Sequence, residues 1–380
     1  MKILLATGIF PPDIGGPATY AATLVPELTR RGHAVTVLTY GKKNKENIPY
    51  ALIVVPRSYP KGIRHVLYFI KALFLSWKAE RVFLLDAAGA GFPGALAAVL
   101  MRRKIILRVV GDYAWEQGMQ RFGVEDLLDD FLQKKYGFFV WILRRVQVFV
   151  ARRAKRIIVP SKYLKSVVEQ WGIEGEKISI VFNSVSLPEA LSREEARRRI
   201  NISGTVLLSA GRFVPWKGFR MLIELMPELL KKYGALFLVI IGDGPERRAL
   251  EQVRDQTGVG ERVLFPGVVE KGALGAYMAA ADVFLLNTAY EGFSHQIVEA
   301  MAFGVPVVTT AAGGNREILE HEENALVVSY NEKKEWEQAI AHLLEDPLIG
   351  KKIAANGRKS AKQFSIERMV AETESLLQAV

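Results

Sequence analysis

Residues 282–310 read DVFLLNTAYEGFSHQIVEAMAFGVPVVTT, and this stretch decides the fold class. DVFLLN and VPVVTT are short apolar runs of the kind that form buried strands of a parallel sheet. Between them, Ser294 can cap a helix that carries Glu299 in its second turn, and Gly304 can end that helix. The stretch therefore predicts a β-α-β unit with two parallel strands.

The same alternation of apolar runs and longer amphipathic stretches extends over all 380 residues. That length favours two domains of about 150–200 residues. The expected strands are KILLAT (2–7), AVTVLTY (34–40), ALIVVP (51–56), RVFLLD (81–86), KIILRVV (104–110), RIIVPS (156–161), TVLLSAG (205–211), LFLVIIG (236–242), RVLFPG (262–267), DVFLLN (282–287) and VPVVTT (305–310). The sequence predicts an α/β fold of two consecutive doubly wound, Rossmann-like domains.

The domain boundary is expected near residues 183–204, where the turn-rich NSVSLPEA precedes the charged run SREEARRRI. We place the N-terminal domain at residues 1–185 and the C-terminal domain at residues 186–364. Ligands of open α/β sheets bind beyond the carboxyl ends of the strands. Two such sheets that face each other would form a central cleft between the domains.

Composition narrows the class of protein. Half of the residues are hydrophobic and 24% are charged, as in a globular protein with true cores. Cysteine does not occur, which excludes disulfides, thiolate metal sites and a cysteine nucleophile and fits a reducing cytoplasm. The N-terminal MKILLATGIF has no small-residue cleavage site, so we interpret it as a first strand and not as a signal peptide.

Positive charge is concentrated in the first half. Residues 1–188 hold 28 Lys and Arg against 14 Asp and Glu, a net charge of +14, whereas the remainder carries −3. This excess favours a polyanion or an anionic membrane surface as partner, with solvated lysine faces as the alternative.

Two segments suggest a membrane partner. HVLYFIKALFLSWK (65–78) and YGFFVWILRRVQVFVARRAKR (136–156) combine aromatic and aliphatic residues with Lys or Arg, as interfacial helices do. Neither offers the ~18–20 uninterrupted apolar residues that a membrane span needs. We expect a cytoplasmic protein that binds the inner face of the membrane peripherally, unless both helices simply pack on the N-terminal sheet.

Two constellations could carry chemistry in the second half. Glu291 follows a strand and Glu299 lies in the next helix, so both can accept hydrogen bonds from ligand hydroxyls near a helix N-terminus. In SAGRFVPWKGF (209–219), Arg212 and Lys217 follow a strand end, where they can neutralise a diphosphate and stabilise a leaving nucleoside diphosphate. The alternatives are surface glutamates and solvated cations beside a helix start.

A third constellation is FPPDIGGPATY (10–20), between the first strand and its helix. Gly15 and Gly16 let backbone N–H groups approach a ligand closely, although Gly and Pro mark any turn.

These motifs together resemble the retaining glycosyltransferases of the GT-B fold, specifically the family-four group, also called glycosyl transferases group 1. The signature of that family is a pair of glutamates with seven residues between them, here Glu291 and Glu299, followed by AMAFGVPVVTT. Arg212 and Lys217 match its phosphate-binding pair. RGHAVTVLT, RIIVPSKYLK, IGDGPE and the FPG of residues 265–267 also fit, so the resemblance spans nearly the whole chain.

The resemblance implies a retaining hexosyltransferase with a UDP- or GDP-linked sugar as donor and a hydroxyl of a lipid-linked or cell-envelope glycan as acceptor. It implies that Glu299 holds the donor ribose, that Glu291 contacts the sugar, that the backbone at Phe293 and Ser294 meets sugar and phosphate, and that Val268 lies near the base. No cofactor and no metal are expected beside this donor. The last helix, residues 365–380, is expected to return to the N-terminal domain.

The chain departs from the family at one position. Many relatives carry a histidine after the N-terminal strand that corresponds to KIILRVV, but this chain reads RVVGDYAWEQ there. Asp112 is the nearest polar residue that can face the sugar, and we predict a catalytic role for it beside Arg212, Lys217 and Glu291. The alternative is an aspartate that caps the following segment.

Other function classes have weaker support. Gly89, Gly91 and Gly94 spell the G-x-G-x-x-G of an NAD(P)-binding oxidoreductase, with Asp112 about twenty residues on. That motif lies in the middle of its domain and leaves the Arg–Lys and glutamate pairs unexplained. RRVQVFVARRAKR (144–156) could bind nucleic acid, but no groove-reading motif accompanies it. A related phosphorylase with pyridoxal phosphate would need a much longer chain.

Overall fold

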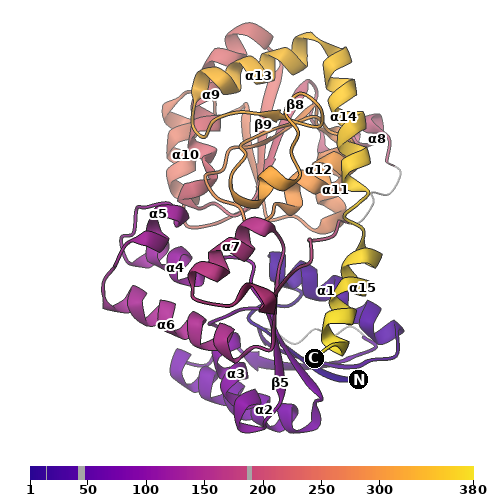
Figure 1. The fold of residues 1–380 in the computed structure, drawn as a ribbon. Coiled ribbons are helices and arrows are strands. Elements are labelled where there is room, and N and C mark those ends of the chain that lie inside the picture. Colours follow the sequence, from indigo (N-terminus) through magenta and orange to yellow (C-terminus); the bar gives the residue numbers. More distant parts are fainter. Residues whose placement is uncertain (14, 42–47, 186–190) are drawn as a thin grey trace. The chain divides into compact units, whose positions relative to one another are not determined.

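The computed structural model describes residues 1–13, 15–41, 48–185 and 191–380. They form two compact units, Met1–Ser184 with Ile366–Val380 and Val185–Ser365, each built around one parallel sheet (Figure 1). The sequence placed the domain boundaries at 185/186 and 364/365, each one residue from the boundary between the two units. Residues 186–190, next to the first boundary, lie outside the described residues.

The sheet of the N-terminal unit has the strand order β3-β2-β1-β4-β5-β6-β7, with all pairs parallel. Its strands are β1 (Lys2–Thr7), β2 (Ala34–Gly41), β3 (Ala51–Pro56), β4 (Arg81–Leu84), β5 (Lys104–Arg108), β6 (Arg156–Val159) and β7 (Ile178–Ile180). The central strands are buried on both faces, which explains why their sequences are continuous apolar runs.

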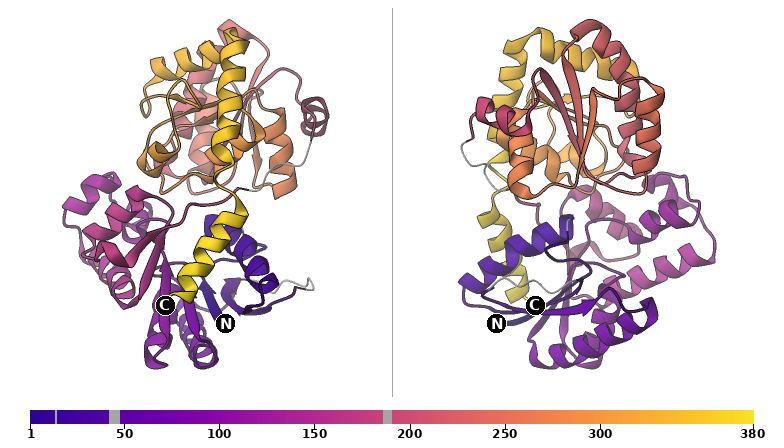
Figure 2. Two further views of the ribbon diagram at one scale, coloured as in Figure 1. Left: turned by 45° about the vertical axis from the view of Figure 1, so that its right-hand side comes forward. Right: turned by 180° about the vertical axis from the view of Figure 1, so that it is seen from behind.

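Helices cover both faces of this sheet (Figure 2). They are α1 (Gly16–Arg30), α2 (Lys61–Lys78), α3 (Gly91–Leu100), α4 (Tyr113–Arg121), α5 (Leu128–Gln133), α6 (Phe138–Arg153), α7 (Lys162–Gln170) and α15 (Ile366–Gln378), with the 3₁₀ turn η1 (Gly175–Lys177). The helices α1 and α15 share one core with the sheet, and α2, α3 and α6 pack on the other face.

The last helix, α15, belongs to the N-terminal unit and lies beside α1. Tyr20 and Thr373 share a buried hydrogen bond of 3.0 Å, and Glu374 accepts from Arg31 and pairs with His33. The chain thus forms this unit from its first 184 residues together with its C-terminal helix.

The sheet of the C-terminal unit has the strand order β10-β9-β8-β11-β12-β13, again parallel. Its strands are β8 (Thr205–Ala210), β9 (Leu236–Ile241), β10 (Val263–Gly267), β11 (Val283–Leu286), β12 (Val307–Thr309) and β13 (Leu326–Val327). Its helices are α8 (Arg193–Ile200), α9 (Phe219–Tyr233), α10 (Arg247–Gln256), α11 (Lys271–Ala280), α12 (His295–Phe303), α13 (Lys333–Glu345) and α14 (Pro347–Ala361), with the 3₁₀ turns η2 (Pro215–Lys217) and η3 (Gly313–Glu317).

Two doubly wound parallel sheets confirm the predicted fold class. Within the described residues, the strands that the sequence missed are the short edge strands β7, with three residues, and β13, with two, because such segments are too short to show a periodic pattern. The predicted β-α-β unit is β11-α12-β12. As predicted, Ser294 caps α12 by accepting from the Ile297 N–H (3.3 Å), and Gly304 ends the helix with a left-handed φ of 68°.

Candidate active site

In the C-terminal unit, the strand order reverses between β8 and β11, the two central neighbours of the sheet. Connections after these strands pass to opposite sides, which opens a crevice at their carboxyl ends and makes this position the usual ligand site of the fold. Lys217 follows β8 and Glu291 follows β11. The two predicted site residues therefore come from the loops on either side of the switch point.

The loop after β8 approaches the loop after β11 at Gly218. This glycine has a φ of 51°, and a Cβ on it would lie 2.7 Å from the carbonyl oxygen of Asn287. Only glycine allows both the left-handed backbone and the close approach. The approach is stabilised by hydrogen bonds from Asn287 Nδ2 to Gly218 O (3.0 Å) and from Ala289 N to Trp216 O (2.8 Å).

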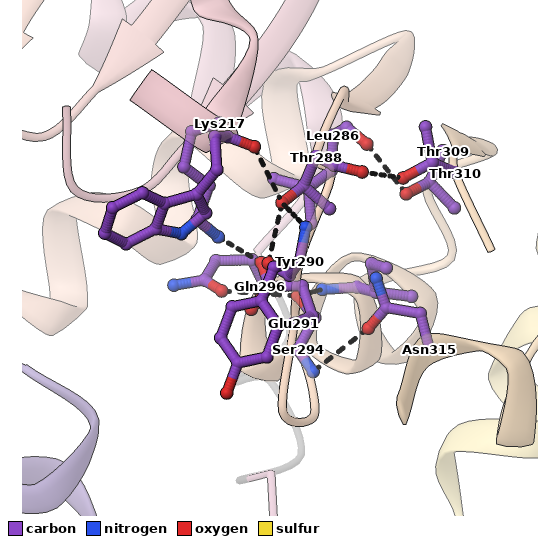
Figure 3. A network of polar contacts seen from close by, with 12 residues as sticks. Lys217, Leu286, Thr288, Tyr290, Glu291, Ser294, Gln296, Thr309, Thr310 and Asn315 are labelled. Carbon is purple, nitrogen blue, oxygen red and sulfur yellow. Dashed lines mark hydrogen bonds and ion pairs between the residues drawn. The ribbon is translucent and has the colours of Figure 1, made fainter. Parts of the chain in front are cut away.

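This pairing of loops brings the Lys217 ammonium against the Glu291 carboxylate, although the two residues are 74 positions apart (Figure 3). Their side chains are 10% and 13% exposed, so the ion pair is mostly withdrawn from water. Charges in such a place need a partner, and here each compensates the other. A phosphate and a sugar hydroxyl are the natural replacements, because one supplies negative charge and the other donates a hydrogen bond.

The loop after β12 also contacts the segment that carries Glu291. After β12, the turn η3 supplies Gly314 N, which donates to Glu291 O (2.9 Å), and Asn315 Oδ1, which accepts from Ser294 N (3.2 Å). Thr310 Oγ1 donates to Thr288 O, as Figure 3 shows. The Glu291 segment is therefore held by loops that follow β8 and β12.

The remaining predicted donor-site residues of this unit lie at the same edge of the sheet or in α12. Arg212 is exposed just after β8, and Val268 is exposed just after β10. Glu299 is half-buried in the second turn of α12, and Phe293 is buried with its ring edge-on to Phe364 at 5.3 Å. The N–H of Ser294, predicted to face sugar or phosphate, donates instead to Asn315 Oδ1.

The glycines of IGDGPE support the Arg212 loop. A Cβ on Gly244 would lie 2.4 Å from Phe213 O, so this loop must approach the Arg212 loop with bare backbone. The hydrogen bonds from Gly211 N to Ile241 O and from Phe213 N to Asp243 O, both 2.9 Å, join the two loops. The IGDGPE loop therefore supports the backbone of the loop that carries Arg212.

In the N-terminal unit, Gly15 and Gly16 lie where β1 is followed by α1. A Cβ on Gly15 would meet Ile9 Cδ1 at 2.9 Å, whereas a Cβ on Gly16 would meet nothing within 4 Å. The backbone at Gly16, the first residue of α1, is thus the more open of the two positions.

Asp112 is the N-cap of α4 and is 1% exposed. Its Oδ1 accepts from Trp115 N (2.9 Å), and its Oδ2 accepts from Gln147 Nε2 and Trp171 Nε1 (both 3.0 Å). Burial raises the pKa of this carboxyl, and the three hydrogen bonds oppose that shift. The structure supports the capping alternative, because both oxygens already accept hydrogen bonds inside the unit, and we leave Asp112 out of the proposed active site.

The G-x-G-x-x-G segment is also explained by internal contacts. Asp86 Oδ1 accepts hydrogen bonds from the N–H groups of Ala88, Ala90 and Gly91 at 3.0–3.1 Å. These are the amides that a dinucleotide pyrophosphate would require in this motif. A carboxylate of the chain itself thus takes the place of the anion, which removes the main argument for a nicotinamide cofactor.

Sequence reasoning missed Asn287, Trp216 and Asn315, the residues that join the three loops. For Asn315 a signal was available, because AAGGN (311–315) directly follows a predicted strand and must therefore reach the same sheet edge. Among the described residues, no group of three or more His, Cys, Asp or Glu could hold a metal ion.

Known proteins match both halves of the chain. Residues 192–360 match the glycosyl transferases group 1, and residues 14–188 match glycosyltransferase family 4. An uncharacterized glycosyltransferase of Methanocaldococcus jannaschii is 28% identical over 98% of this chain and 97% of its own length. A GDP-mannose-dependent alpha-(1-6)-phosphatidylinositol monomannoside mannosyltransferase of Mycolicibacterium smegmatis is 28% identical over 94% of this chain and 92% of its own length.

A crystal structure of Anabaena HepE in complex with UDP-glucose is similar over the full length of both chains, with a TM-score of 0.83 and 23% identity. At this identity the likeness concerns the fold, and it agrees with two Rossmann-like domains of the GT-B type.

Proposed function

Because the chain belongs to the family-four glycosyltransferases, we propose that it transfers a hexose-type sugar from a nucleotide-sugar donor to an acceptor hydroxyl. The observation that carries the donor site is the Lys217–Glu291 ion pair at the switch point of the C-terminal sheet. Lys217, with Arg212 nearby on the same loop, would bind the diphosphate. Glu291 would then accept hydrogen bonds from the sugar, and Glu299 from the ribose.

The proposed reaction retains the configuration at the anomeric carbon. The bond from that carbon to the diphosphate oxygen breaks while the acceptor oxygen bonds on the same face, and the acceptor proton passes to the departing diphosphate. The role of Lys217 and Arg212 is to stabilise the negative charge that develops on that diphosphate. Glu291 needs no nucleophilic role in this scheme, consistent with its pairing to a cation.

The relatives suggest the substrate classes. One is GDP-mannose-dependent and acts on a phosphatidylinositol mannoside, and a protein of the same fold binds UDP-glucose. We propose a UDP- or GDP-linked donor and an acceptor in a lipid-linked or cell-envelope glycan. A lipid-linked acceptor would bring the enzyme to the inner face of a membrane as a peripheral protein, and the described residues include no helix long and apolar enough to cross one.

The test is a panel of UDP- and GDP-hexoses incubated with the protein and membrane lipid extract, with the product anomer assigned by nuclear magnetic resonance. Release of UDP or GDP coupled to a product of the donor's own anomeric configuration is expected. A product of inverted configuration would refute the retaining scheme, and reduction of a nicotinamide cofactor without sugar transfer would refute the reaction class.

Replacing Glu299 with alanine is expected to weaken donor binding about ten- to one-hundred-fold. Hydrogen bonds to a charged group contribute about 1.5–3 kcal/mol, and the ribose would lose its carboxylate partner. Calorimetric titration with UDP and GDP measures the effect, and Glu337→Ala on the distant helix α13 is the matched control. Unchanged nucleotide affinity would remove Glu299 from the site.

Activity is expected to persist without divalent metal, because Lys217 and Arg212 already supply the cationic charge that a metal would otherwise provide at the diphosphate. Turnover should remain within about two-fold of the untreated rate after EDTA dialysis. Loss of activity in EDTA with recovery in Mn²⁺ would contradict metal independence.

A further inference from the structure

The outer face of α2 carries an apolar stripe. Its members are large and exposed, with 42–64% of their surface accessible: Ile63, Val66, Ile70, Phe74 and Trp77. They follow one another at intervals of three or four residues, so they share one side of the helix. The opposite side, with Tyr68 and Ala72, is buried on the sheet. The stripe therefore does not belong to the core of the N-terminal unit, and exposed patches of this kind mark interaction sites.

The charged side chains of α2 are all positive. The helix contains four Lys and Arg and no Asp or Glu. Arg64, Lys71 and Lys78 follow at seven-residue intervals, so they form a row beside the stripe, and Lys71 and Lys78 are exposed. At the C-terminal end of the helix, Arg103 Nη2 donates to the backbone Trp77 O (2.6 Å), which adds a further cation at this end of α2.

This combination fits an anionic lipid surface. Interfacial helices place aromatic and aliphatic residues in the boundary between headgroups and acyl chains, while Lys and Arg remain at the anionic headgroups. The second segment that the sequence suggested, α6, exposes Phe138, Phe139 and Trp141 in its first turn but carries no exposed apolar stripe along its length. Its Arg144 turns inward, where it donates to Lys134 O and stacks over the Phe131 ring at 4.0 Å.

We propose that α2 is a membrane-docking face, which lies in the plane of an anionic bilayer surface with Phe74 and Trp77 inserted between the headgroups. The proposal extends the acceptor class suggested by the proposed function. Docking is measured without donor or acceptor, however, so its failure and a failure of glycosyl transfer are distinguishable.

Vesicle flotation of the full chain tests the proposal, with vesicles of phosphatidylcholine alone or with phosphatidylglycerol. Binding is expected only with phosphatidylglycerol and should weaken from low to high salt, since exposed charges are screened. Phe74→Ala with Trp77→Ala should reduce the partition coefficient at least about ten-fold, because two large apolar side chains no longer leave water.

Charge-reversal variants distinguish an effect of the α2 face from an effect of the net charge of the protein. Lys71→Glu with Lys78→Glu should abolish binding, because each basic residue near an anionic surface contributes about five-fold. Lys351→Glu with Lys359→Glu on α14 changes the net charge equally, and Leu348→Ala removes a side chain that is 75% exposed; neither should alter binding. Circular dichroism of all variants verifies that they fold.

Three outcomes would overturn the proposal. They are no flotation of the wild-type protein with anionic vesicles at low salt, equal loss of binding in the α2 and α14 charge variants, and a dimer in analytical ultracentrifugation that Phe74→Ala with Trp77→Ala dissociates. The last result would assign the stripe to a second copy of the chain.

Discussion

Replacement of Lys217 by alanine is expected to lower kcat by about 10²–10³, the usual effect of losing one preorganised group that stabilises a developing anion. The hydrogen bonds that join its loop to the Asn287 loop fix the backbone on both sides of Lys217, so the side chain starts from a defined position beside the proposed diphosphate site. Arg212→Ala, in the same loop after β8, is also expected to lower kcat. Steady-state kinetics with the identified donor measures both effects.

Controls separate catalysis from folding. Lys217→Ala leaves the Glu291 carboxylate without its cation, so thermal unfolding must be measured alongside kcat. Lys217→Ala with Glu291→Gln removes both charges and should restore stability but not turnover. Lys231→Ala, an exposed lysine of α9, should behave as the wild type. Turnover at the wild-type rate in folded Lys217→Ala would place the phosphates elsewhere.

Replacement of Asp112 by alanine is expected to lower the free energy of unfolding by about 3–7 kcal/mol. The substitution removes a helix cap and leaves three buried donors, from Trp115, Gln147 and Trp171, without an acceptor. The lost cap at the Trp115 N–H costs about 1 kcal/mol, and the unsatisfied donors of Gln147 and Trp171 cost about 1–3 kcal/mol each. Urea unfolding measures the change, with exposed Asp129→Ala in the same unit as control.

The variant Asp112→Asn distinguishes a structural role of Asp112 from a catalytic one. If Asp112 only caps α4, Asp112→Asn should be less stable than the wild type but should turn over at close to the wild-type rate at a temperature where it is folded. If Asp112 faces the sugar, as the sequence suggested, Asp112→Asn should keep its stability and lose transfer. The hydrogen bonds lead us to expect the first result.

The sequence by itself determined the fold class and the longer strands of both sheets. The apolar runs of β11 and β12 and the period of α12 are properties of neighbouring residues. So are the cap at Ser294 and the left-handed Gly304, because a cap and a helix end depend on side chains three residues away and on a single φ. The positions of Lys217 and Glu291 after their strands followed from the same local pattern.

Only the tertiary structure decided what these residues contact. The Lys217–Glu291 pair joins positions 74 residues apart, and it forms because Gly218 lets two backbones approach. Asp112 accepts from Gln147 and Trp171, which come from α6 and the end of α7, and Asp86 occupies the amides of a glycine motif that looked free in the sequence. Local periodicity carries no record of which loops meet at a sheet edge, because that depends on strand order and on hydrogen bonds between distant segments.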